Sequence, residues 1–216
     1  MMHTYYNLQH QKRNRGFTLV ELLVALAISG IVLLLVGQFF ISTNETNTIQ
    51  EKVAGTQQGI RAVMEMMTRD VRMAGLDPSK NAGNAGFADG AIESEDTDSD
   101  SIAIRYDYDG DGACDDNMEF IRYSFDAANQ RLMCSWSNNG GGSWQTQPLT
   151  ENGTVNSLTF SYTLDDGTTD TDPSANGTLG NIRSVTINMC GQVTGAYSDK
   201  ANNNLCFSNT ITPRNM

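Results

Sequence analysis

Histidine is scarce in this sequence, and the two that occur, His3 and His10, both lie within its first ten residues. Histidine is the usual general base near neutral pH and the commonest metal ligand in proteins. Its absence from the rest of the chain excludes Ser-His-Asp catalysis there and disfavours transition-metal sites. A serine–lysine pair with Lys52, Lys80 or Lys200 has no supporting sequence context. The sequence therefore predicts a protein that is not an enzyme.

Basic residues are also few. The 216 residues include 14 lysines and arginines against 25 aspartates and glutamates, which gives a formal net charge of −11. Three of the basic residues, Lys12, Arg13 and Arg15, precede the first long apolar run. Binding to nucleic acid requires a basic surface that neutralises phosphates. The acidic balance of the remaining chain therefore predicts that nucleic acid is not a partner.

Proline is missing from the N-terminal part of the chain, because the first of the four prolines is Pro78. An apolar run extends there from Phe17 to Ile41, and Glu21 is the one charged residue within it. A helix rises about 1.5 Å per residue, so about 20 apolar residues match the hydrocarbon core of a bilayer. The basic residues before the run predict a cytoplasmic N-terminus and place everything after Ile41 outside.

The start of this run resembles the type IV prepilin signal. Residues 16–28 read Gly-Phe-Thr-Leu-Val-Glu-Leu-Leu-Val-Ala-Leu-Ala-Ile. The resemblance implies cleavage between Gly16 and Phe17 by a prepilin peptidase, N-methylation of Phe17 and assembly of the helix into a pilus or pseudopilus. An ordinary signal anchor would have no need of a glutamate in its apolar core. A cleaved secretory signal would have a shorter apolar region that ends in small residues.

Glu21 is a candidate assembly residue. A carboxylate within lipid is costly, so it is expected to have a functional role and a partner. The resemblance to pilins implies that Glu21 pairs with the free amine of Phe17 on a neighbouring subunit. The alternative is that Glu21 lies at the level of the headgroups and only marks the membrane edge.

The helix is predicted to continue beyond the membrane and to end near Gly75 and Pro78. Apolar residues recur there at steps of three and four, at Ile49, Val53, Ile60, Val63, Met64, Met67, Val71 and Ala74. The expected organisation is a leader at 1–16, a transmembrane or filament-core half-helix at 17–41, an amphipathic half-helix at 42–77 and a globular domain at 78–216.

The globular domain is predicted to be an antiparallel β-sheet with one buried face, which the amphipathic half of the helix covers. Residues 81–100 are expected to form a surface loop. Alternating apolar residues then predict strands at 101–107, 119–125, 130–137, 157–164, 183–189 and 205–212. The fold class is therefore α+β, with a long N-terminal helix packed on a C-terminal sheet.

Four cysteines, Cys114, Cys134, Cys190 and Cys206, lie in the part of the chain expected outside the cytoplasm. An even number in an oxidising compartment indicates two disulfides, for which three pairings exist. Closeness in sequence favours Cys114–Cys134 and Cys190–Cys206. Four free, buried thiols are the alternative.

The segment from Asp107 to Asp116 resembles an EF-hand calcium loop, with carboxylates at alternate positions followed by a glycine. Asp107, Asp109, Asp111 and Asp115 are the candidate ligands. The pattern departs at its end, because Met118 stands where the bidentate glutamate belongs and Glu119 follows one residue late. The alternative is a solvated acidic loop whose residues suit turns.

Residues 69–75 and the tail Thr212-Pro213-Arg214-Asn215 are similar to those of PilW-like minor pilins. This resemblance implies a minor subunit of a type IV pilus, with other pilins and the prepilin peptidase as partners and a role in motility or adhesion. The precursor would lie in the inner membrane, and the processed chain would reach the periplasm and the cell-surface pilus. A minor pseudopilin of type II secretion and a calcium-dependent adhesin are the alternatives.

Overall fold

The structure is a computed structural model that describes residues 16–83, 85–88, 97–116, 118–195, 198–199 and 205–215. The predicted leader up to residue 15 and much of the expected loop at 81–100 therefore lie outside the described residues. The chain divides into two compact units, residues 1–48 and 49–216, and each is treated separately below.

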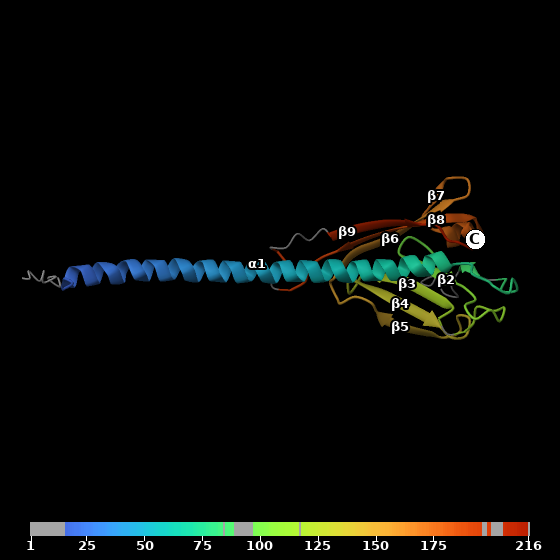
Figure 1. Ribbon diagram of the computed structural model, residues 1–216. Helices are drawn as coiled ribbons and strands as arrows, with labels where there is room; N and C mark the ends of the chain where they lie inside the picture. The colour runs from blue at the N-terminus through green and yellow to red at the C-terminus, as the bar shows by residue number, and fades with distance from the viewer. Residues whose placement is uncertain are drawn as a thin grey trace, which may run out of the picture. The chain divides into compact units, whose positions relative to one another are not determined.

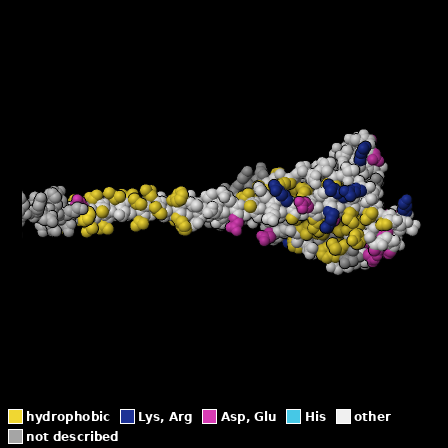
Figure 2. Space-filling view, viewed as in Figure 1, with side chains coloured by type: hydrophobic (Ala, Val, Ile, Leu, Met, Phe, Trp, Pro, Cys, Tyr) yellow, Lys and Arg dark blue, Asp and Glu magenta, His cyan; other side chains and the backbone are white. Residues whose placement is uncertain are grey.

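The described part of the first unit is the beginning of helix α1 (Leu19–Met73). Its apolar side chains up to Ile41 are exposed, from Leu19 at 74% to Ile41 at 61%. Figure 2 shows these hydrophobic side chains on the surface of the segment. Within the described residues, α1 is the helix that is long and apolar enough to cross a membrane. The predicted helix is confirmed, and its exposed apolar surface requires lipid or other helices around it.

The second unit contains two antiparallel sheets, shown in Figure 1. The first has, in spatial order, β1 (Gly86–Phe87), β2 (Ser101–Arg105), β3 (Phe120–Asp126), β4 (Arg131–Ser137) and β5 (Trp144–Pro148). The second has β7 (Thr169–Asp170), β6 (Val155–Leu164), β8 (Ile182–Gly191) and β9 (Leu205–Ile211). A short helix α2 (Pro173–Asn176) and a 3-10 turn η2 (Leu179–Asn181) connect β7 to β8.

The α+β class is confirmed, and all six predicted strands are present with ends shifted by at most two residues. The expectation of one sheet is corrected to two, because β4 pairs with β5 and not with β6. Strand β5 was missed because its residues are mostly exposed and lack an apolar alternation. Strands β1 and β7 have two residues each, which is too short for any periodicity.

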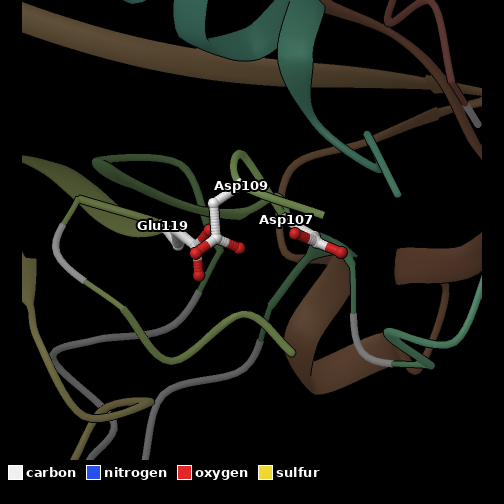
Figure 3. Close-up of side chains that lie close together, drawn as sticks. All are labelled: Asp107, Asp109 and Glu119. Carbon is white, nitrogen blue, oxygen red and sulfur yellow. The ribbon is translucent and has the colours of Figure 1, made fainter. Parts of the chain in front are cut away.

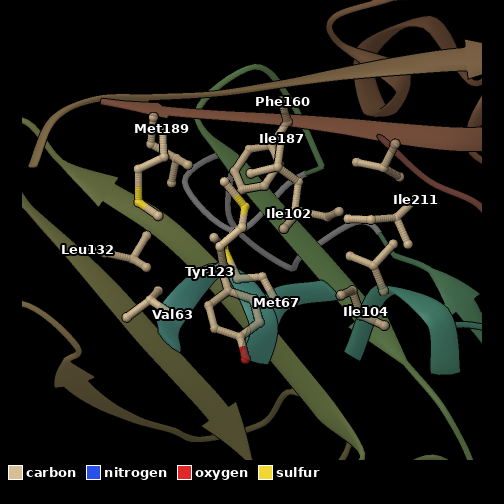
Figure 4. Packing of buried hydrophobic residues seen from close by; sticks show 14 of the residues in the cluster. Val63, Met67, Ile102, Ile104, Tyr123, Leu132, Phe160, Ile187, Met189 and Ile211 are labelled. Atoms are coloured by element: carbon tan, nitrogen blue, oxygen red, sulfur yellow. The ribbon is translucent and has the colours of Figure 1, made fainter. Parts of the chain in front are cut away.

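The main core lies between the two sheets and the second half of α1. Figure 1 shows β6, β8 and β9 along one side of this half of the helix and β3, β4 and β5 along the other. In Figure 4, Val63 and Met67 of α1 lie among Tyr123 of the first sheet and Phe160 and Ile187 of the second. The predicted amphipathic stripe is thus the surface on which both sheets pack.

A buried polar contact ties α1 to the first sheet. The Tyr123 hydroxyl of β3 donates a hydrogen bond of 2.6 Å to Oδ2 of Asp70, and Arg69 Nε donates to Oδ1 at 3.0 Å. Asp70 is 1% exposed and Tyr123 is fully buried. Burial and the adjacent Asp70 carboxylate raise the pKa of the Tyr123 hydroxyl far above its ordinary range. This contact joins the second half of α1 to β3 within the core.

The end of α1 is joined to the strand that leads into the acidic loop. Gly75 adopts a φ of 75°, a left-handed conformation that commonly terminates helices. Its N–H donates to the carbonyl of Arg105 at 3.2 Å, and the N–H of Asp107 donates to the carbonyl of Leu76 at 2.8 Å. These two bonds position the residues after β2 against the end of the helix.

Gly191 marks the closest approach between α1 and β8. A Cβ atom at Gly191 would lie 1.9 Å from Cδ1 of Ile60 and 3.2 Å from the carbonyl oxygen of Thr154. Ile60 is 1% exposed, so its side chain has little room to move away. We therefore expect Gly191→Ala to lower the free energy of unfolding by about 1–3 kcal/mol, as overpacking of cores does.

Chemical denaturation of the full chain in detergent measures this effect. Gly180→Ala is the matched control, because a Cβ there would meet nothing within 4 Å and the φ of Gly180 is not positive. Equal midpoints for Gly191→Ala and Gly180→Ala would show that the helix does not pack on β8 as described.

The cysteines behave differently from the prediction. Cys190 and Cys206 form a disulfide between directly opposed residues of β8 and β9, with a Cα–Cα distance of 4.0 Å. Cys114 and Cys134 are both free and buried, so the expected Cys114–Cys134 bond is not formed. The physical reason is that Cys134 points into the main core from β4, whereas Cys114 lies in the acidic loop beside Glu119 and Asp107.

Candidate functional site

The predicted cleavage position lies just before α1. Gly16 and Phe17 are both exposed, and the side chain of Phe17 is 91% exposed. A Cβ at Gly16 would meet nothing within 4 Å. The two residues on either side of the predicted cleavage position are therefore exposed, which suits a substrate of a membrane protease.

Thr18 and Glu21 form a reciprocal capping box at the start of α1. The N–H and hydroxyl of Thr18 donate to Oε2 of Glu21 at 2.8 and 2.9 Å, and the N–H of Glu21 donates to the Thr18 hydroxyl at 3.3 Å. These bonds satisfy donors that a helix N-terminus otherwise leaves unpaired. Sequence reasoning missed this role of Glu21, although the Thr-x-x-Glu spacing was the available signal.

The capping box leaves part of the Glu21 carboxylate available. All of its bonds from Thr18 end on Oε2, and among the described residues Oε1 accepts no hydrogen bond. The carboxylate lies at the beginning of an apolar helix whose surrounding side chains are exposed. The arrangement can therefore hold a second, positively charged partner without breaking the local cap.

The acidic loop between β2 and β3 contains two buried carboxylates. Asp107 is fully buried, and its two oxygens accept the N–H groups of Gly110 at 2.6 Å and Gly112 at 3.1 Å. Glu119 is 2% exposed and accepts the N–H groups of Tyr108 at 2.8 Å and Asp116 at 3.1 Å. The two side chains, one at each end of the loop, therefore stabilise it through hydrogen bonds from its backbone N–H groups.

The structure groups the carboxylates of the loop differently from the predicted set. Carboxylate oxygens of Asp107, Asp109 and Glu119 lie within 4.8 Å of one another, as do those of Asp109, Asp111 and Asp116. Figure 3 shows Asp109 between Glu119 and Asp107. The predicted ligand Asp115 belongs to neither group within the described residues. Glu119, not Asp115, completes the first cluster.

Met118, directly before Glu119, has an unusual backbone conformation. Its φ is 67°, in the left-handed region that a non-glycine residue seldom adopts. The residue after Glu119, Phe120, begins β3, and its ring is buried.

The electrostatics of the loop are strongly negative. Burial raises the pKa of the Cys114 thiol to about 11, and the nearby Glu119 and Asp107 carboxylates contribute to that rise. Desolvation is the largest cause that raises the pKa of the Asp116 carboxyl. Repulsion from the acidic neighbours Asp109 and Glu119 raises it further. A divalent cation would relieve this repulsion. Carboxylate oxygens are the ligands that calcium prefers, so the residues present fit such an ion.

Comparisons with known proteins concern the N-terminal signal and the family of the chain. Residues 11–37 match the prokaryotic N-terminal methylation motif, and residues 50–205 match the family described as prepilin peptidase-dependent protein B. The chain is also similar to the pilin-like protein PilA3 of Thermus thermophilus, with 44% identity over 61 residues. That match covers 28% of this chain and 26% of the relative, so the chain spans only about a quarter of the relative's length.

The two family matches fall on the two parts of the chain described above. The methylation motif covers the cleavage position, Glu21 and the start of α1. The second match covers the amphipathic half of α1 and most of both sheets, which is more than half of the chain. The protein therefore belongs to the prepilin peptidase-dependent protein B family, a family of type IV pilin-like structural proteins and not of enzymes.

Proposed function

We propose that this protein is a minor pilin of a type IV pilus. The first half of α1 holds the precursor in the inner membrane, with its N-terminus in the cytoplasm. A prepilin peptidase cuts between Gly16 and Phe17 and methylates the new N-terminus. The observation that carries the proposal is the single carboxylate, Glu21, on an otherwise apolar and exposed helix immediately after the cleavage position.

Assembly replaces lipid contacts of the helix with contacts to like helices. The apolar side chains between Phe17 and Ile41 remain covered throughout, so the transfer from bilayer to filament exposes little of them to water. Within the filament core, Glu21 pairs with the amine of Phe17 on a neighbouring subunit. Each charge alone would be costly in that environment, and together they offset much of the cost.

Features of the second unit support a minor subunit and not a major subunit of the filament. Residues 69–75 and the tail at 212–215 resemble PilW-like minor pilins, which supports a role in a small complex that primes or caps the filament. Other minor pilins are the partners in such a complex, and surface motility or adhesion is the process served. A minor pseudopilin of type II secretion has the same processing and the same helix.

The number of surface filaments distinguishes a role in a type IV pilus from a role in a type II pseudopilus. Deletion of the gene is expected to reduce surface pili several-fold, and the wild-type chain is expected at low stoichiometry in sheared filaments. Complementation with the full chain should restore the pili. Normal piliation together with a loss of protein secretion would instead assign the chain to a pseudopilus.

We also propose that the acidic loop binds a calcium ion. The role of this ion is to stabilise the loop and not to act as a signal. Support comes from the two carboxylate clusters that share Asp109 and from the buried positions of Asp107 and Glu119. The ion would be held by Asp107, Asp109 and Glu119, with Asp111 and Asp116 nearby. The loop is flanked by strands and not by helices, so no helix opening is coupled to it.

Isothermal titration of the full chain in detergent tests calcium binding. We expect heat on addition of up to millimolar Ca²⁺, loss of that heat in Asp109→Asn, and retention in Asp115→Asn, which removes an equal charge outside both clusters. Binding should weaken as pH falls, because the raised pKa of Asp116 lets protons compete with the ion at higher pH. Absence of heat at millimolar Ca²⁺ would remove the proposal.

A further inference from the structure

A groove rich in arginine lies between the end of α1 and the C-terminal tail. Its volume is about 670 Å³, and Arg69, Arg72 and Arg214 line it together with one carboxylate, Glu65. The tail is held there because the N–H of Arg214 donates to the carbonyl of Arg72 at 3.2 Å. Three guanidinium groups thus gather on one surface of a chain whose net charge is −11.

The three arginine residues of this groove are exposed, and one of them, Arg69, pairs with an acidic residue. The side chain of Arg69 is 66% exposed although its Nε atom contacts the buried Asp70 carboxylate. Arg72 and Arg214 form no salt bridge within the described residues. Guanidinium groups bind carboxylates with two parallel hydrogen bonds, so a surface of this kind favours an acidic partner.

An apolar hollow adjoins the groove and shares two of its residues. The hollow has a volume of about 440 Å³ and is lined by Arg69, Asp70, Met73, Tyr106, Tyr108, Met118 and Ile121. Tyr108 is 73% exposed and Met118 is 41% exposed, and these are the two large hydrophobic side chains exposed in the described part of the second unit. Figure 2 shows a broad hydrophobic area on this unit beside basic side chains.

The combination has the composition of a protein interface. Tyrosine, methionine and arginine are enriched at the centres of such interfaces, where an apolar anchor enters a hollow and polar groups surround it. We propose that this surface binds an acidic segment of another protein subunit, with an apolar side chain in the Tyr108–Met118 hollow and carboxylates on Arg72 and Arg214. The inference does not rest on the proposed role in pilus priming.

The same surface does not suit a two-fold pairing of two copies that is centred on Arg69. Arg69 lines both the groove and the hollow and so lies at the centre of the surface. A two-fold pairing of two copies brings the same residues together at its axis. Such a pairing here would place the two Arg69 side chains against each other, and like charges at an interface are strongly unfavourable.

Photo-crosslinking of the full chain in its own cells tests this inference. Tyr108 is replaced by p-benzoyl-phenylalanine, and Gln147 on the exposed edge strand β5 is replaced in the same way as a control. The Arg72→Glu/Arg214→Glu double variant is compared with Arg183→Glu, which reverses a charge on an exposed part of β8. Thermal unfolding of each variant checks that it folds.

We expect position 108, and not position 147, to crosslink to a peptide of a different protein that contains aspartate or glutamate. The yield should fall at least about tenfold in Arg72→Glu/Arg214→Glu, remain in Arg183→Glu, and recover when the partner's carboxylate is changed to lysine. A crosslink to lipid or to a second copy, no crosslink above the control, or no effect of the charge reversal would overturn the inference. Filament incorporation is scored separately, so failure here is distinguishable from failure of the proposed function.

Discussion

Replacing Glu21 by alanine is expected to leave the protein in the membrane but to abolish its incorporation into filaments. Insertion depends on the apolar residues from Phe17 to Ile41, which the substitution leaves in place. In the proposed assembly, incorporation depends on the pairing of Glu21 with the amine of Phe17 on a neighbour. Without the carboxylate, that amine would enter the apolar core as an unpaired charge, which costs several kcal/mol.

The capping box requires a second comparison, because Glu21→Ala removes both the charge and the helix cap. Glu21→Gln keeps an oxygen that accepts from the N–H of Thr18 but removes the charge. Thr18→Ala keeps the charge but removes the hydroxyl from the cap, which should cost only about 1 kcal/mol. If the charge pairing controls assembly, Glu21→Gln fails like Glu21→Ala, whereas Thr18→Ala assembles.

Immunoblots of membranes and of sheared filaments measure the two steps separately. Each variant should appear in the membrane fraction in the processed form. Normal amounts of Glu21→Gln in the filament fraction would refute the pairing and leave only the local cap as the role of Glu21.

The buried contact between Asp70 and Tyr123 gives the second large expected effect. Asp70→Ala leaves the Tyr123 hydroxyl buried without its acceptor and should lower the free energy of unfolding by about 3 kcal/mol. Tyr123→Phe should cost about 2 kcal/mol, because the Asp70 carboxylate keeps its bond from Arg69. Asp70→Asn is the milder control, since its amide oxygen still accepts from Tyr123.

The raised pKa of Tyr123 adds a dependence on pH. A tyrosine ionises near pH 10 in the unfolded chain, whereas Tyr123 keeps its proton to higher pH in the folded chain. The unfolded state therefore loses a proton first, and stability falls as pH rises above about 10. Tyr123→Phe should lose that part of the alkaline destabilisation. Denaturation curves at pH 7 and pH 11 give the free energy of unfolding at each pH. If this free energy falls equally between the two pH values in the wild type and in Tyr123→Phe, the prediction is contradicted.

Much of the fold could be predicted because its local patterns agree with its packing. The steps of three and four from Ile60 to Val71 are the helix face that enters the core. Strands such as β6 and β8 alternate between buried and exposed residues, as the sequence alternates. The end of α1 follows from Gly75, whose left-handed conformation needs no long-range information.

The missed features depend on contacts between distant residues. The edge strand β5 has no alternation of apolar and polar residues. It is a strand because it pairs with β4, which the local sequence does not show. The predicted Cys114–Cys134 bond was wrong because closeness in sequence does not show that Cys134 faces the main core from β4 whereas Cys114 lies in the acidic loop. Glu119 belongs to the acidic cluster although it comes one residue late for an EF-hand loop, so the sequence pattern did not indicate it.

The arginine groove also lies beyond what local patterns can show. Arg69 and Arg72 belong to α1, and Arg214 belongs to the tail, which the chain brings back beside the helix only after both sheets. The cleavage position differs in this respect. Its motif is contiguous, so the local sequence is enough to predict it, and the methylation motif that matches residues 11–37 includes it.

Mass spectrometry of the N-terminus of the chain from sheared surface filaments tests the central claim most directly. The account predicts a chain that begins at Phe17, carries one methyl group on its amine and lies within the filament fraction. A chain that retains residues 1–16, or one found only as a soluble domain outside filaments, would contradict it.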